Sequence, residues 1–157
     1  MKLTIVAVSQ RPPEWAQSAF DDYLKRMPPD WQIDVKTVKP ADRQLGKTAT
    51  QNMAIEAERI EAALKNTAGV RVALDERGKS LTTEAFLNFI QTQHDTHGGV
   101  IFIIGGADGL DADFKSSCPL KIQLSAMTLP HALVKVLLAE QIYRAYSIAT
   151  GHPYHRS

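Results

Sequence analysis

The most apolar stretch of the chain is residues 100–104, with the sequence VIFII, and two glycines follow it directly. Every residue of the stretch is β-branched or aromatic, and no polar residue interrupts it. Such a run is typical of a strand that is buried on both faces, as in a parallel sheet that helices cover on each side. The run therefore predicts the central strand of an α/β fold.

The rest of the chain alternates between strand and helix patterns. Strands are predicted at residues 3–8, 31–35, 70–75 and 120–124. Helices are predicted at residues 14–27, 53–64, 82–90 and 132–150, with a short helix from about residue 111. A polar loop is expected at residues 39–50 and a turn at residues 76–80. These elements predict one domain over residues 1–157, of the α/β class, with a mainly parallel sheet and helices on both faces.

The charge balance limits the classes of function. The chain has 18 Lys and Arg against 17 Asp and Glu, a net charge of +1, so any RNA contact must be a local patch. The polar segment Lys39–Thr50 carries Lys39, Arg43 and Lys47. This segment is either a solvated connection or a mobile basic loop that meets phosphate, and the sequence leaves both interpretations open.

Cysteine usage and hydropathy bear on the location of the protein. Cys118 is the only cysteine, so it cannot form an internal disulfide, and we interpret it as structural. No apolar run reaches the roughly 18 residues that a membrane span requires. The N-terminal stretch MKLTIVAV is too short and too strand-like for a signal peptide. We expect a cytoplasmic protein without a membrane partner.

The chemistry is expected where the predicted strands end, because open parallel sheets bind ligands outside the carboxyl ends of their strands. The strand ends that carry informative residues are Leu74-Asp75, Gly105–Gly109 and Leu124–Leu129. The double glycine allows the backbone to approach a ligand closely, but neither a GxGxxG nor a P-loop pattern is present. Ser125 lacks the GxSxG context of a serine hydrolase. His152 and His155 have no carboxylate nearby in sequence, so no metal site is expected.

The C-terminal part of the chain is unusual in two respects. The predicted helix at residues 132–150 is apolar on most of its faces, so we expect it to pack in a subunit interface as well as in the core. The tail that follows, HPYHRS, is dense in groups that stack, titrate or donate hydrogen bonds. Chain ends are usually bland, so this tail is a candidate functional segment.

Three motifs carry a resemblance to a known family: IIGGADGL, LSAMTLPHALVKVLLAEQIYRAYSI and the terminal HPYHRS. The chain resembles the bacterial large-subunit ribosomal RNA pseudouridine-N3 methyltransferases, which are small single-domain members of the SPOUT class of S-adenosylmethionine-dependent enzymes. The N-terminal MKLTIVAV resembles the family too, so the likeness covers nearly the whole chain. One departure is that the family usually has Pro and Glu where this chain has Ala107 and Asp108; Asp keeps the carboxylate on a side chain one methylene shorter.

The resemblance implies a C-terminal trefoil knot, which composition would not reveal, and S-adenosyl-L-methionine as the cofactor. It implies that the strand-end loops hold the adenosine of that cofactor. The residues carried over for this contact are Leu74, Gly105, Gly106, Leu124, Ser125, Ala126, Met127, Thr128 and Leu129. It further implies a homodimer that acts on 23S rRNA in the assembled ribosome and methylates N3 of a pseudouridine in a stem-loop.

The N3–H group is a weak acid, so a base or a hydrogen-bond network must help to remove its proton. We expect Arg144 to orient a carbonyl or phosphate, Tyr154 to stack on the base and His155 to accept the proton. The alternative for Arg144 is an ion pair with Glu140 one helical turn away. His131 is expected to start the last helix and to shape the cofactor pocket.

Two other functions stay open at this stage. A ribosome-binding module without catalysis would bind RNA and show no affinity for the cofactor. A SPOUT ribose 2′-O-methyltransferase would use the same cofactor, but such enzymes commonly carry an added RNA-binding domain that this sequence does not contain.

Overall fold

The computed structural model of the protein describes residues 1–156, apart from the side chain of Gln44, and Ser157 at the end of the predicted tail lies outside the described residues. The fold is built on a five-stranded sheet with the order β2-β1-β4-β3-β5, and all of its neighbouring strands are parallel. The strands are β1 (Lys2–Val8), β2 (Gln32–Val38), β3 (Val70–Ser80), β4 (Val100–Ile104) and β5 (Leu120–Gln123). The prediction of a central strand at residues 100–104 and of a parallel sheet is confirmed.

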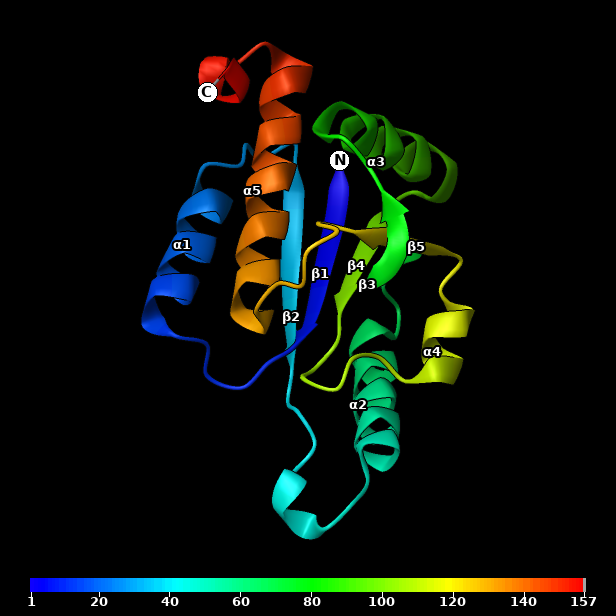
Figure 1. Ribbon diagram of the computed structural model, residues 1–157. Helices are drawn as coiled ribbons and strands as arrows, with labels where there is room; N and C mark the ends of the chain where they lie inside the picture. The colour runs from blue at the N-terminus through cyan, green and yellow to red at the C-terminus, as the bar shows by residue number, and fades with distance from the viewer. Residues whose placement is uncertain (157) are drawn as a thin grey trace.

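Helices cover both faces of the sheet (Figure 1). The helices are α1 (Glu14–Lys25), α2 (Ala49–Leu64), α3 (Thr83–His97), α4 (Ala112–Ser117) and α5 (His131–Thr150), with short 3-10 helices η1 (Arg43–Leu45) and η2 (Pro153–Arg156). The core over one face joins strand residues to α1, α3 and α5, for example through Phe20, Ile90 and Ile142. The core over the other face joins strand residues to α2 and α4, through Ile60 and Phe114.

The strand sequences explain why both faces are covered. In β1, Leu3 and Ile5 belong to the core with α1, α3 and α5, while Val6 and Val8 belong to the core with α2 and α4. Successive side chains of a strand point to opposite faces, so a strand with apolar residues on both of its faces needs helices on both sides. The same alternation holds in β4, where Phe102 and Ile103 belong to different cores.

Two local predictions were wrong. The turn expected at residues 76–80 belongs to β3, whose pairing with β5 shifts register between Leu74 and Lys79. A Cβ on Gly78 would lie 2.5 Å from the carbonyl carbon of Ile122, so the glycine lets the two backbones pass closely. The loop expected at residues 39–50 is also shorter, because η1 interrupts it and Thr48 already caps α2 in a capping box with Gln51.

Helix α5 runs from the carboxyl ends of the strands to their amino ends. It begins beside the carboxyl end of β1, where His131 Nε2 lies 2.8 Å from the carbonyl oxygen of Val8. Its C-cap is Gly151, which takes the left-handed conformation with φ 73°. The tail helix η2 follows at the end of the molecule where the strands begin (Figure 1). The side chains of α5 at Leu133, Val136 and Leu137 are only half-buried within one chain.

Cys118 is buried beside α4, and this burial raises the pKa of its thiol, as expected for a structural cysteine. Among residues 1–156, no helix combines the length and the hydropathy needed to cross a membrane.

Candidate functional site

The carboxyl edge of the sheet holds two adjoining cavities, of about 440 Å³ and about 140 Å³. They share lining residues in the middle of β3, where its pairing with β5 shifts register, in the loop after β5 and in the first turn of α5, among them Leu74, Leu129 and Val134. The volume of the larger cavity lies in the range of small-molecule and cofactor sites, roughly 300–1,000 Å³. The cavities therefore form the candidate cofactor site.

The structure brings the predicted cofactor residues together from three separate segments. Leu74 and Leu129 line both cavities, and Gly105 and Gly106 line the larger one. Leu124, Ser125, Met127 and Thr128 line the smaller one. Ala126 is the one predicted cofactor residue that does not line either cavity. His131, which was expected to shape the cofactor pocket, lines the larger cavity.

The two glycines after β4 serve the folding of their own loop. A Cβ on Gly105 would lie 2.9 Å from the carbonyl carbon of Gly109, because the loop turns back on itself there. A Cβ on Gly106 would lie 2.7 Å from Oε1 of Glu56. Glu56 is buried on α2 and its Oε2 accepts a hydrogen bond from the backbone N–H of Ala41 at 3.0 Å. A side chain at Gly105 would thus meet backbone, and one at Gly106 would displace the carboxylate of Glu56, a crowding that the sequence did not suggest.

Two ion pairs beside the larger cavity were not predicted from the sequence motifs. Asp75 forms an ion pair with Lys115 at 3.5 Å, and both line the larger cavity. Asp108 pairs with Arg43 of η1 at 2.8 Å, and this hydrogen-bonded carboxylate raises the pKa of Arg43. The Arg43–Asp108 pair joins the basic loop to the glycine loop. The acid after Leu74 was visible in the sequence; the partner of Asp108 was not.

The second predicted site lies at the other end of α5. Arg144 forms an ion pair with Glu140. Its Nε donates a hydrogen bond to Oε1 of Glu140 at 2.8 Å, and its Nη2 lies 2.6 Å from the same oxygen. This is the ion pair that the sequence offered as the alternative for Arg144. The guanidinium carbon of Arg144 also lies 4.9 Å from the ring centre of Tyr154, so cation–π attraction holds the tail to the helix.

Tyr154 is anchored by its ring and its hydroxyl group. Its ring meets Tyr143 edge-on at a centroid distance of 4.7 Å. Its hydroxyl lies 3.3 Å from the hydroxyl of Tyr23 and 3.2 Å from Oε1 of Glu140. Burial, the Tyr23 contact and the charge of Glu140 together raise the pKa of Tyr154 above its usual value. Tyr154 therefore stays a neutral phenol at neutral pH and is no candidate for a base.

His155 is half-buried, and its Nδ1 is shielded from solvent without a hydrogen-bond partner among the described residues. Without a movement of the ring, Nε2 is the nitrogen that His155 can offer to a ligand. Among residues 152–156, the exposed members of the tail are His152, Pro153 and Arg156.

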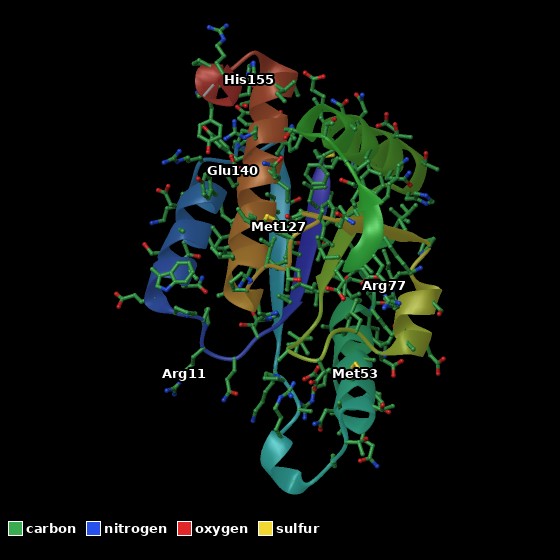
Figure 2. All side chains as sticks on the ribbon, in the orientation of Figure 1. Arg11, Met53, Arg77, Met127, Glu140 and His155 are labelled. Atoms are coloured by element: carbon green, nitrogen blue, oxygen red, sulfur yellow. The ribbon has the colours of Figure 1, made fainter. Side chains whose placement is uncertain are left out.

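The cofactor site and the tail are separate within one chain. The residues of α5 that line the cavities are His131 and Val134, while Arg144, Tyr154 and His155 line neither cavity. Val134 and Arg144 are about 15 Å apart along the helix axis, given a rise of 1.5 Å per residue. Figure 2 shows His155 at the far end of α5 from the first turn of that helix. One chain thus carries both predicted sites without joining them.

A metal site finds no basis in the described part of the chain. Among residues 1–156, no group of three or more His, Cys, Asp or Glu side chains is placed to hold a metal ion.

Comparisons with known proteins bear on the whole chain. The family model described as a predicted SPOUT methyltransferase matches residues 1–155. The protein called ribosomal RNA large subunit methyltransferase H from Bordetella petrii is 50% identical over 157 residues, which is 100% of both chains. The protein of the same name from Paraburkholderia phymatum is 49% identical over 156 residues, 99% of each chain.

Solved structures with the same fold are more distant in sequence. A probable methylase family protein from Haemophilus influenzae superposes with a TM-score of 0.59 at 11% identity, over 97% of this chain and 69% of that one. TrmJ from Z. mobilis superposes with a TM-score of 0.52 at 14% identity, over 92% of this chain and 70% of that one. These structures support the SPOUT-type α/β fold, while the trefoil knot stays a prediction. The full-length identity decides the family: the chain belongs to the SPOUT methyltransferases, among the ribosomal RNA large subunit methyltransferase H proteins.

Proposed function

We propose that this protein is an S-adenosyl-L-methionine-dependent methyltransferase that acts on N3 of a pseudouridine in a stem-loop of 23S rRNA, on the assembled ribosome in the cytoplasm. The observation that carries the proposal is the identity of about half of all residues, end to end, with ribosomal RNA large subunit methyltransferase H proteins. The motifs LSAMTLPH and HPYHR support the finer assignment to pseudouridine N3.

The residues at the carboxyl edge suit this cofactor. An adenosine needs an apolar slot with backbone partners, and Leu74, Leu129 and Val134 provide apolar walls beside the loops after β4 and β5. The Ser125 hydroxyl accepts a hydrogen bond from the N–H of Met127 at 2.9 Å, which fixes the turn of the second loop. Asp75 and Glu76 line the larger cavity, where Lys115 compensates the charge of Asp75, and the carboxylate of Glu76 favours a positively charged ligand. When bound, S-adenosylmethionine supplies a methyl group on a positively charged sulfonium.

Methyl transfer requires the acceptor nitrogen to lie within about 3–3.5 Å of the reacting carbon. The tail and the cavities of one chain are too far apart for that if the tail receives the nucleotide. We infer that the active site is formed by two chains, with the tail of one chain placed over the cavities of the other. The half-buried residues Leu133, Val136 and Leu137 on α5 give such a pairing an apolar surface.

In this arrangement each tail residue has a role that follows from its contacts. His155 accepts the N3 proton at Nε2, because Nδ1 is shielded. Arg144 and Tyr154 fix the position of the tail through Glu140 and Tyr143, and we expect Arg144 to orient a carbonyl or phosphate of the nucleotide from there. The protonated hydroxyl of Tyr154 donates a hydrogen bond to Glu140 and does not accept a proton, which leaves the base role to His155.

The dimer is a testable part of the proposal. We expect light scattering to give twice the chain mass at micromolar concentration, because an obligate interface of this kind buries on the order of 2,000 Å² in total. Leu137→Asp places a charge in the middle of the half-buried surface of α5 and should shift the mass toward one chain. Leu45→Asp is the matched control, because Leu45 is 64% exposed in η1, away from α5. A wild-type monomer would contradict the proposed pairing.

The function is tested by incubating the protein with labelled S-adenosylmethionine and ribosomes that lack the modification, and then mapping the labelled nucleotide. Label on N3 of a pseudouridine in 23S rRNA is the expected result. Label on a ribose oxygen would identify a 2′-O-methyltransferase instead. Ribosome binding without any label would identify a binding module. Free 23S rRNA in parallel shows whether the assembled ribosome is required.

A further inference from the structure

The tail is held in place by one carboxylate. Glu140 Oε1 accepts hydrogen bonds from Nε of Arg144 at 2.8 Å and from the hydroxyl of Tyr154 at 3.2 Å. Its side chain is only 13% exposed, so both contacts form in a partly desolvated place where they are stronger than at the surface. Figure 2 shows Glu140 on α5 below the tail that carries His155.

The same carboxylate is fixed from the other side. Its Oε2 accepts a hydrogen bond from Nε2 of Gln141 at 2.8 Å, and the side-chain oxygen of Gln141 accepts one from the hydroxyl of Thr83 at the start of α3. On the side of α1, the hydroxyl of Tyr23 meets that of Tyr154 at 3.3 Å. Glu140 thus lies at the centre of a network that joins α1, α3, α5 and η2.

We propose that Glu140 is a positioning residue for methyl transfer: by binding Arg144 and Tyr154 together, it holds η2 in the orientation that presents His155 to the acceptor nucleotide. This inference rests on the proposed function of the tail. Glu140 itself does not touch the reacting atoms; it acts through Tyr154 and Arg144.

The chemistry of the network explains why a carboxylate is needed there. Arg144 and the Tyr154 hydroxyl are both donors in the contacts with Oε1, and an anionic acceptor binds such donors more strongly than a neutral one. Glutamine at this position keeps an acceptor oxygen and loses the charge. Alanine loses both, and it leaves the guanidinium of Arg144 next to Tyr154 without the carboxylate that orients it.

The experiment compares Glu140→Gln and Glu140→Ala with the wild type in two measurements. The first is hydrogen exchange of the peptide that contains residues 152–156, which we expect to become about tenfold faster in Glu140→Ala because local contacts set its protection. The second is the rate of methyl transfer to ribosomes. We expect kcat to fall by about 10²-fold in Glu140→Ala, the size of effect that a misplacement near 1 Å produces, and less in Glu140→Gln. The Kd for S-adenosylmethionine, measured by calorimetry, should not change.

Glu61→Gln is the matched control. It breaks an ion pair of similar length, 2.6 Å to Arg71, that joins α2 to β3 on the opposite face of the sheet. This variant should leave tail exchange and kcat as in the wild type. A double-mutant cycle with Tyr154→Phe tests the route of the effect. If Glu140 acts through the Tyr154 hydroxyl, Tyr154→Phe lowers kcat in the wild type and lowers it much less in the Glu140→Ala background.

The outcomes separate this inference from the proposed function. Fast tail exchange with an unchanged kcat would show that Glu140 orders the tail without serving the reaction, which overturns the inference and leaves the methyltransferase intact. Unchanged exchange overturns it as well. If the wild type itself labels no pseudouridine, the proposed function fails, and the exchange data alone then show whether Glu140 holds the tail.

Discussion

A chain that ends at Gly151 is expected to bind S-adenosylmethionine with unchanged affinity and to transfer no detectable methyl group to the ribosome. The cavities are lined by residues in the middle of β3, in the loops after β4 and β5 and in the first turns of α4 and α5, and none of those is removed. The deletion removes the residues that we propose to receive the nucleotide, His155 among them. Calorimetric titration with the cofactor and a ribosome methylation assay measure the two functions separately.

The deletion also has a structural cost that the sequence did not suggest. Tyr143 is buried in the full chain and its ring packs against that of Tyr154. Loss of this aromatic pair should lower the free energy of unfolding by about 1 kcal/mol, which a domain with the usual 5–15 kcal/mol tolerates. Urea unfolding provides that control. If the shortened chain methylates at the normal rate, the acceptor site lies elsewhere; if it loses the cofactor, the tail closes the cofactor site.

Mixed dimers should recover activity from two inactive variants. Gly106→Val disables the cavities of one chain, because a side chain at this position runs into the buried Glu56, and the deletion of residues 152–157 disables the tail of the other. In a mixed dimer the intact cavities of the shortened chain meet the intact tail of its partner. Coexpression at equal amounts gives half mixed dimers with one competent site each, so about a quarter of wild-type activity should return.

The control for this mixture is a pair of variants with the same defect, Gly105→Val with Gly106→Val. Both damage the same loop, so no combination of the two chains restores a competent site. Circular dichroism and light scattering must first show that each variant folds and pairs. Recovery in the control as well, or no recovery in the test mixture, would contradict a site formed by two chains.

The sequence predicted the centre of the sheet well because β4 has no polar residue and β1 is apolar over most of its length. Residues 100–104 could hardly be anything other than a central strand, and β4 lies between β1 and β3. The error at residues 76–80 came from reading Gly78 as a turn signal. Its actual place is determined by the backbone of Ile122, a residue 44 positions later in the numbering. A local pattern cannot report a contact of that kind.

In the candidate site too, local features were predicted from the sequence and contacts between distant residues were not. The cofactor loops were predicted from motifs, and every predicted cofactor residue except Ala126 lines a cavity. The pair of Glu140 and Arg144 was readable because its members are one helical turn apart. The contact between Tyr23 and Tyr154 joins residues that are 131 positions apart, so no local pattern could reveal that the hydroxyl of Tyr154 is held there; the stacking of its ring on the base stays a prediction.

The strand order has a consequence for the way the chain is made. β1 is the first of the five strands to be synthesised, and one of its two neighbours is β4. The edge of β1 that pairs with β4, with Leu3 opposite Val100, therefore stays unpaired until β4 has been made. Leu138 and Ile142, with which α5 packs into the core over one face of the sheet, lie still later in the chain than β4. Pairing between distant segments is slow, and an unpaired strand edge is a site for aggregation until it is covered. The core between α5 and the sheet therefore cannot close until residues 131–150 have been made.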